Sequence, residues 1–233
     1  MVTLDSFAVL KKLTVTNLTV EPSRVRAEYR VESGSGEEDS ADLIYSYDTP
    51  VFEKGNPAHL NLASIMIVQP ALNYGLFFDK IVFDGYFDET DRRFITDMME
   101  NTSREIAVNK LLAENPFLIP DYQHPVAHTP NRYTHAECIF TNGSFSLPEK
   151  KLDEPADGSS SFAVLSSGGK DSLLTYGIMK EIGEVFPFFV NEAGRHWFTA
   201  LNGYRYLKQY DKNTAKVWCN CDRLYTWMLR KFP

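Results

Sequence analysis

The first part of the chain alternates between apolar and polar residues, a pattern typical of strands that turn one face to a core. Segments 12–20 (KLTVTNLTV) and 24–31 (RVRAEYRV) both alternate, and Glu21-Pro22-Ser23 between them suits a turn. The pattern therefore predicts a β-hairpin. A third strand over 41–51 is predicted after a polar loop rich in serine and glycine.

Helical spacing dominates the region that follows. Segment 60–72 is apolar enough for a buried helix, and Asn56-Pro57 suits its N-cap and first turn. Segment 88–112 repeats apolar residues at helical spacing, which predicts a long amphipathic helix. A short strand is predicted over 80–83. Residues 1–147 are thus predicted to form an α+β domain, with strands first and helices after.

The pattern of apolar and polar residues changes after a predicted linker. Residues 148–161 (PEKKLDEPADGSSS) combine charge, proline, glycine and serine without apolar periodicity. Beyond them, short apolar strands alternate with helices, which is typical of a parallel α/β sheet. The strands are predicted over 162–165, 185–190 and 215–219, and the helices over 171–182, 195–209 and 222–231. Residues 162–233 therefore read as a second domain.

Composition narrows the function classes. Of the 233 residues, 43% are apolar and 24% are charged, as in folded globular proteins. The formal net charge of -7 argues against a general nucleic-acid binder or a peripheral membrane binder, which need a basic surface. No apolar run approaches the length of a membrane span. Three cysteines are too few for a disulfide framework, so a reduced, cytoplasmic compartment is expected.

The most informative segment is 166–172 (SSGGKDS), which follows the predicted strand 162–165 and opens the next helix. Ligands bind at this end of the strands in open parallel sheets. Adjacent glycines let the backbone turn sharply, and the amides at a helix N-terminus then point at an anion. Lys170 adds a positive charge. Asp171 is anionic, so it either caps the helix or holds a metal bound to the phosphates.

The pattern is neither a Walker A loop nor a dinucleotide fingerprint. Segment 167–172 (SGGKDS) resembles the S-G-G-x-D-S signature of the PP-loop ATP pyrophosphatases. This resemblance covers only about residues 161–233. It implies an adenine-nucleotide α-hydrolase-like domain, a parallel three-layer αβα fold, of which this chain holds the N-terminal part.

The same resemblance implies an activity. Members of this superfamily bind ATP and Mg²⁺, and an oxygen of the substrate attacks the α-phosphate, which releases pyrophosphate and leaves an adenylated substrate. By analogy Lys170 and Asp171 are the catalytic residues, and Asp171 holds the metal. The expected nucleotide contacts are Ser167, Gly168, Gly169, Lys170, Asp171 and Ser172.

A narrower resemblance concerns the ATP-dependent epimerases of UDP-muramoyl-dipeptide glutamate. Short patterns at 51–53, 73–75 and 104–106 fall where that family has similar ones. This likeness implies adenylation of a carboxylate. Since PP-loop domains normally contain about five strands, we also expect a fragment or a half-domain whose sheet is completed by another chain, for example in a homo-oligomer.

Further polar residues follow the other predicted strands of the second domain. Asn191 and Glu192 end the second strand, and Arg195 or His196 nearby could contact a nucleotide; the alternative is a loop with a helix cap. Segment 219–221 (CNC) could suggest sulfur transfer or an iron–sulfur site. Its spacing instead favours two small buried residues at a strand end.

The histidines do not define a metal site. His124, His128 and His135 lie in and just after a proline-rich stretch, near Glu137 and Cys138, without the spacing of a zinc site. Three functions stay open: an ATP-dependent adenylating enzyme, a nucleotide-binding regulatory or scaffold protein, and a tRNA-modifying enzyme. The acidic balance counts against the third. The acceptor substrate stays unidentified.

Overall fold

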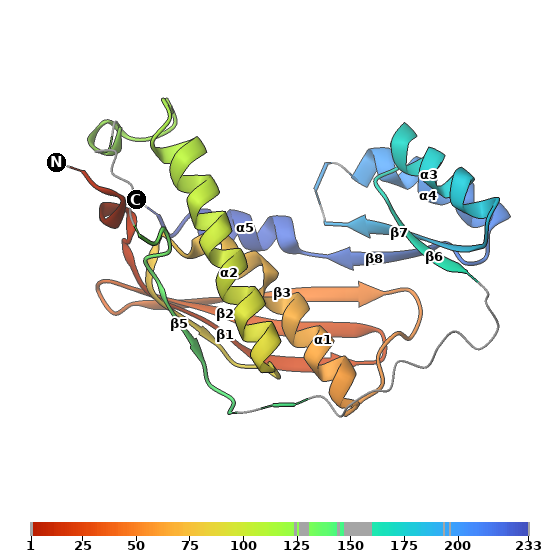
Figure 1. Cartoon of the computed structure of the whole chain (residues 1–233), viewed down its shortest axis with the longest axis horizontal. Coiled ribbons are helices and arrows are strands. Elements are labelled where there is room, and N and C mark those ends of the chain that lie inside the picture. The colour runs from red at the N-terminus through yellow and green to blue at the C-terminus, as the bar shows by residue number, and fades with distance from the viewer. Residues whose placement is uncertain are drawn as a thin grey trace.

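The chain forms a mixed α/β structure around one continuous sheet (Figure 1). The computed structural model describes residues 2–123, 125, 131–143, 145–146, 160–192, 194–195 and 197–232. Eight strands of this described part lie in the order β5-β4-β1-β2-β3-β8-β7-β6. The α/β class expected from the sequence is confirmed at this level.

The N-terminal strands follow the predicted hairpin. Strands β1 (Leu10–Glu21), β2 (Arg24–Ser33) and β3 (Glu38–Tyr47) pair antiparallel in sequence order. Strand β3 ends at Tyr47 rather than at residue 51, because the amides of Val51 and Phe52 bond the carbonyl of Pro22 outside the ladder.

Two parallel strands extend the sheet beyond β1. They are β4 (Phe78–Phe83), which was predicted, and β5 (Glu137–Phe140), which was not. Strand β5 has only four residues and none of them is buried, so it carries too little alternation to be recognised in the sequence.

Helices α1 (Pro57–Val68) and α2 (Glu89–Ile106) cover one face of these strands (Figure 1). The side chain of Asn56 accepts hydrogen bonds from the amides of Ala58 and His59, so the predicted cap of α1 is confirmed. The helix gives way to a 3₁₀ segment at Gln69–Tyr74, because Pro70 has no amide to donate.

The C-terminal part alternates strands and helices as predicted. Its elements are β6 (Ser161–Ser166), α3 (Lys170–Lys180), β7 (Glu184–Asn191), α4 (Trp197–Tyr210), β8 (Ala215–Cys219) and α5 (Cys221–Leu229). Strands β6, β7 and β8 are parallel, and β8 joins the N-terminal strands by pairing antiparallel with β3. The predicted linker lies mostly outside the described residues, so the domain boundaries stay a prediction.

Helix α5 contributes to the core of the N-terminal strands. Cys221, Leu224 and Met228 are buried in the same apolar cluster as residues of β1, β2, β4, α1 and α2. Cys219 at the end of β8 belongs to it as well. Residues that the sequence assigns to the second domain therefore stabilise the first.

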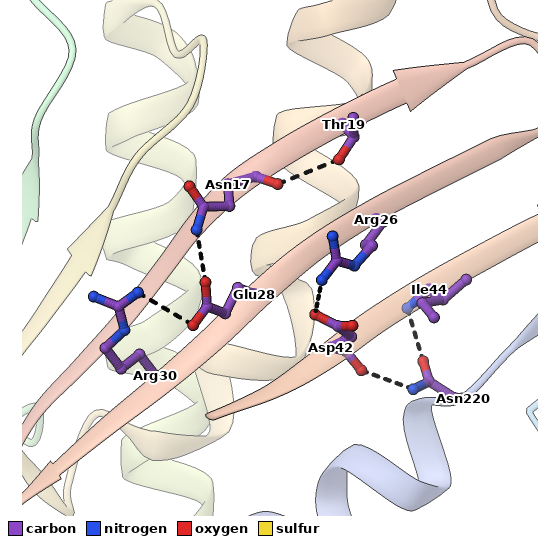
Figure 2. Close-up of polar contacts among 8 residues, drawn as sticks. All are labelled: Asn17, Thr19, Arg26, Glu28, Arg30, Asp42, Ile44 and Asn220. Carbon is purple, nitrogen blue, oxygen red and sulfur yellow. Dashed lines mark hydrogen bonds and ion pairs between the residues drawn. The ribbon is translucent and has the colours of Figure 1, made fainter. Parts of the chain in front are cut away.

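The side chain of Asn220, between β8 and α5, hydrogen-bonds to the backbone of β3 (Figure 2). Its Oδ1 accepts from the amide of Ile44 at 2.7 Å, and its Nδ2 donates to the carbonyl of Asp42 at 2.7 Å. The side chain thus satisfies two backbone groups of β3 beyond the last residue pair of the β3–β8 ladder. Nearby exposed pairs, such as Arg26 with Asp42, keep the rest of this sheet face polar.

We expect Asn220→Ala to lower the free energy of unfolding by about 1–3 kcal/mol, because it leaves both backbone groups of β3 without a partner. Urea denaturation measures this change. Asn202→Ala, at an exposed position of α4, is the control and should change stability by less than about 0.5 kcal/mol. Equal effects of the two substitutions would contradict the bridging role of Asn220.

Asp211 is a buried carboxylate directly after α4. Its Oδ2 accepts from Lys180 Nζ at 2.6 Å and from the Tyr176 hydroxyl at 2.7 Å, and its Oδ1 accepts from the Asn213 amide. Burial alone would raise the pKa of Asp211, but these hydrogen bonds outweigh it and hold the pKa below its usual value. Asp211 thereby ties α3 to the end of α4.

This lowered pKa predicts an acid dependence of stability. A carboxylate whose pKa is lower in the folded state stabilises the fold above its unfolded pKa of about 4, and this contribution is lost as the pH falls through the folded pKa. We expect Asp211→Asn to be destabilised relative to the parent at about pH 6, with a difference that shrinks toward about pH 3. Urea midpoints across this pH range test it, and a constant difference would contradict it.

Candidate functional site

The loop between β6 and α3 turns at Gly168, whose φ is +75°. Few residues other than glycine adopt this left-handed conformation. A Cβ on Gly168 would also lie 2.6 Å from Ala200 Cα and 2.7 Å from the Thr199 carbonyl oxygen. The loop is therefore packed directly against the backbone of α4, and Gly168 is required there on two independent grounds.

The hydroxyls of two serines, Ser166 and Ser172, form hydrogen bonds within the loop between β6 and α3. Ser166 Oγ accepts from the amide of Gly168 at 3.2 Å and lies 3.0 Å from Ser172 Oγ. Ser172 Oγ in turn donates to the carbonyl of Gly169 at 3.0 Å. Ser172, predicted as a nucleotide contact, is thus engaged within the loop. Ser166 belongs to the segment 166–172 that the sequence singles out, but its role was not predicted: it is a buried residue that positions the loop. Its place at the strand end was the only signal.

Helix α3 begins at Lys170 without a side-chain cap. Gly169, which has no side chain, occupies the N-cap position, and Asp171 lies inside the first turn. The alternative in which Asp171 caps the helix is therefore wrong. Ser167, Lys170 and Asp171 are all exposed. The first-turn amides, one ammonium and one carboxylate therefore meet at the carboxyl end of a parallel strand, where a helix dipole favours an anion.

The residues after β7 lie at the same end of the sheet. Asn191 ends β7 and is half-buried, in register with Trp218 of β8, and the neighbouring Glu192 is exposed. Arg195 is exposed in the first turn of the segment leading into α4, where its carbonyl accepts from the amide of Phe198. The structure therefore places Asn191 and Arg195 at the strand end that carries the loop. His196 lies outside the described residues.

A surface groove of about 540 Å³ adjoins the loop. Its walls come from Gly168, from Leu173 of α3 and from α4, which supplies Phe198, Asn202 and Tyr206 among others. The rings of Phe198 and Tyr206 are mostly exposed. The sequence reasoning did not single out this groove, because it forms only when α3 and α4 pack side by side.

The two cysteines of segment 219–221 are buried, as the preferred interpretation expected. The interaction between their thiols lowers the pKa of Cys219, and together with burial it raises the pKa of Cys221. Within the described part of the chain, no group of three or more His, Cys, Asp and Glu side chains could hold a metal ion.

The histidine pattern near residue 135 lies far from the loop. His135 contacts the carboxylates of Asp5 and Asp79 beside β4 and β5, at the opposite edge of the sheet from β6. His124 and His128 lie outside the described residues. The interpretation that these histidines form no zinc site stays a prediction.

Comparison with known proteins finds no matching family model, no matching curated protein and no matching solved structure. Of the helices in the described residues, none combines the length and the apolar character that a membrane crossing requires. The case for a function therefore depends on the loop and its surroundings.

Proposed function

We propose that the chain binds ATP at the loop 167–172 and transfers its adenylyl group to an acceptor oxygen, with release of pyrophosphate. One observation carries this proposal: a glycine loop with the sequence SGGKDS joins a parallel strand to the uncapped N-terminus of α3. Backbone amides and the helix dipole at such a position favour phosphate oxygens.

The residues would act by holding charge. Lys170 and the first-turn amides of α3 bind the β- and γ-phosphates, which become the leaving group. The acceptor oxygen forms a bond to the α-phosphorus, and the bond from that phosphorus to the bridging oxygen breaks. Pyrophosphate departs with the electron pair, so its growing negative charge is stabilised by fixed donors. No nucleophile from the protein is required.

The exposed Asp171 carboxylate suits Mg²⁺, which prefers oxygen ligands and commonly uses one or two carboxylates together with phosphate oxygens. A bound Mg²⁺ would neutralise phosphate charge. Asp171 would then orient the ion toward the phosphates, and Lys170 would neutralise the charge that remains. The acceptor is proposed to be a carboxylate or a carbonyl oxygen.

Two measurements test the proposal: ATP binding by calorimetry, and pyrophosphate release with pools of amino acids, other carboxylates and tRNA. We expect Lys170→Ala to abolish release and to weaken ATP binding by at least about tenfold, since a charge-assisted phosphate contact is worth about 1.5–3 kcal/mol. The matched control is Lys212→Ala, an exposed lysine in the turn between α4 and β8. Unchanged ATP binding in Lys170→Ala would overturn the loop assignment.

The same assay separates the competing functions. Release only with tRNA would favour the modifying enzyme. ATP binding without release from any pool would favour a nucleotide-binding regulatory or scaffold protein and would contradict the adenylating activity. Asp171→Asn tests the metal role. It should reduce the gain in ATP affinity that Mg²⁺ provides, and it should change the ATP affinity measured without Mg²⁺ less.

A further inference from the structure

Ser166 places a hydroxyl at the end of β6, at a position that would suit an apolar side chain. It lies on the same face of the strand as the buried Val164, and it is only 6% exposed. A buried hydroxyl costs free energy unless it finds hydrogen-bond partners. Among the described residues these partners are the amide of Gly168 and the hydroxyl of Ser172. The Ser166 side chain therefore serves the loop rather than the core.

The direction of each hydrogen bond follows from the donors available, because a serine hydroxyl has one proton. The Gly169 carbonyl can only accept, so Ser172 directs its proton to that oxygen at 3.0 Å. Across the 3.0 Å contact between the two hydroxyls, Ser166 must therefore be the donor. The Ser166 oxygen also accepts from the Gly168 amide. The bonds thus form one chain, which runs from Gly168 through Ser166 and Ser172 to Gly169.

The last bond of this chain can be exchanged at low cost. The Gly169 carbonyl also accepts from the amide of Leu173 at 3.1 Å, so it keeps a partner when the Ser172 proton turns away. Ser172 is half-buried in the first turn of α3, beside the amides that bind phosphate in the proposed function. After such a turn its oxygen still accepts from Ser166. This bond strengthens Ser172 as a donor, because hydrogen bonds in a chain polarise one another.

We propose that Ser166 is a positioning residue for the phosphate site, and that it holds Ser172 so that the Ser172 proton exchanges between the Gly169 carbonyl and a phosphate oxygen of ATP. This inference rests on the proposed ATP site. Ser166 is buried, so it acts through two groups of the loop rather than on the nucleotide. It orients the Ser172 hydroxyl, and it fixes the left-handed turn through the Gly168 amide.

ATP binding measured by calorimetry tests this role. We expect Ser166→Ala to weaken ATP binding about tenfold, since two hydrogen bonds of the loop are lost. Ser166→Cys keeps a side chain of similar shape but hydrogen-bonds weakly, so it should weaken binding as well. Ser166→Thr keeps the hydroxyl and should bind ATP more tightly than either. The control is Ser161→Ala, at the exposed start of β6, which should bind ATP like the parent.

A double-mutant cycle separates positioning from a purely structural role. If Ser166 acts through Ser172, replacing Ser166 in the Ser172→Ala background should weaken ATP binding at least about threefold less than replacing it in the parent. A loss of stability alone would not depend on Ser172 in this way. Circular dichroism checks that each variant is folded.

The outcomes distinguish this inference from the ATP assignment. If Lys170→Ala weakens ATP binding and a folded Ser166→Ala does not, the role of Ser166 is wrong and the ATP site stands. Independent effects of Ser166 and Ser172 in the cycle would also contradict that role. If Ser166→Ala does not fold, equal affinities of the Cys and Thr variants would contradict it. A parent chain that binds no ATP would contradict both the role and the site.

Discussion

Met228→Ala is expected to destabilise the N-terminal strands, although Met228 lies near the other end of the sequence. Met228 is fully buried in the cluster that contains Leu13, Val25 and Ile81. Shortening a buried methionine to alanine typically costs about 2–5 kcal/mol, from lost burial and from the cavity left behind. Urea denaturation measures this loss, and hydrogen exchange locates it.

The control for this prediction is Met98→Ala, on an exposed position of α2, which should cost less than about 0.5 kcal/mol. Hydrogen exchange should increase in β1, β2 and β4 of Met228→Ala as well as in α5. Faster exchange confined to residues 160–232 would contradict a shared core, because the N-terminal strands would then be stable without α5.

Gly168→Ala is expected to disrupt the phosphate loop. Alanine at φ +75° is strained, and its Cβ would press on the backbone of α4 at Ala200 and Thr199. Strain of this kind costs about 1–3 kcal/mol, and its relief requires the loop to leave its position against α4. We therefore expect lower stability, measured by urea denaturation, together with the loss of measurable ATP binding.

Two other glycines, one in the loop and one in α3, are matched controls. Gly169 has a negative φ, and a Cβ there would meet only Ser167 Oγ at 3.5 Å, so Gly169→Ala should cost little stability. Gly177→Ala, with open space around it in α3, should stabilise by about 0.5–1 kcal/mol through helix propensity. If Gly168→Ala matched Gly169→Ala in stability, the packing of the loop on α4 would not be the constraint.

Much of the local structure could be predicted from residue spacing. Alternation in segments 12–20 and 24–31 indicated the hairpin, because each strand turns one face to the core. Asn56-Pro57 marked the start of α1, since a capping side chain and a proline act within one helical turn. Strand β5 was not predicted, because its four residues include no buried one and so show no alternation of apolar and polar positions.

The candidate site was predictable in position but not in construction. The sequence places SGGKDS between a strand and a helix, and the structure brings Asn191 and Arg195 to the same strand end. The contact of Gly168 with α4 and the role of Ser166 could not be predicted, because both depend on how the loop packs after folding.

The sequence by itself determined the α/β class, most elements and the place of the glycine loop, since these follow from interactions between residues close in the chain. Only the tertiary structure decided that β8 pairs with β3, that α5 completes the N-terminal core and that β6 ends the strand order of the described residues. The physical reason is that strand order and shared burial depend on contacts between distant segments. An alternating or apolar pattern shows that a residue will be buried, but it does not specify against which partner.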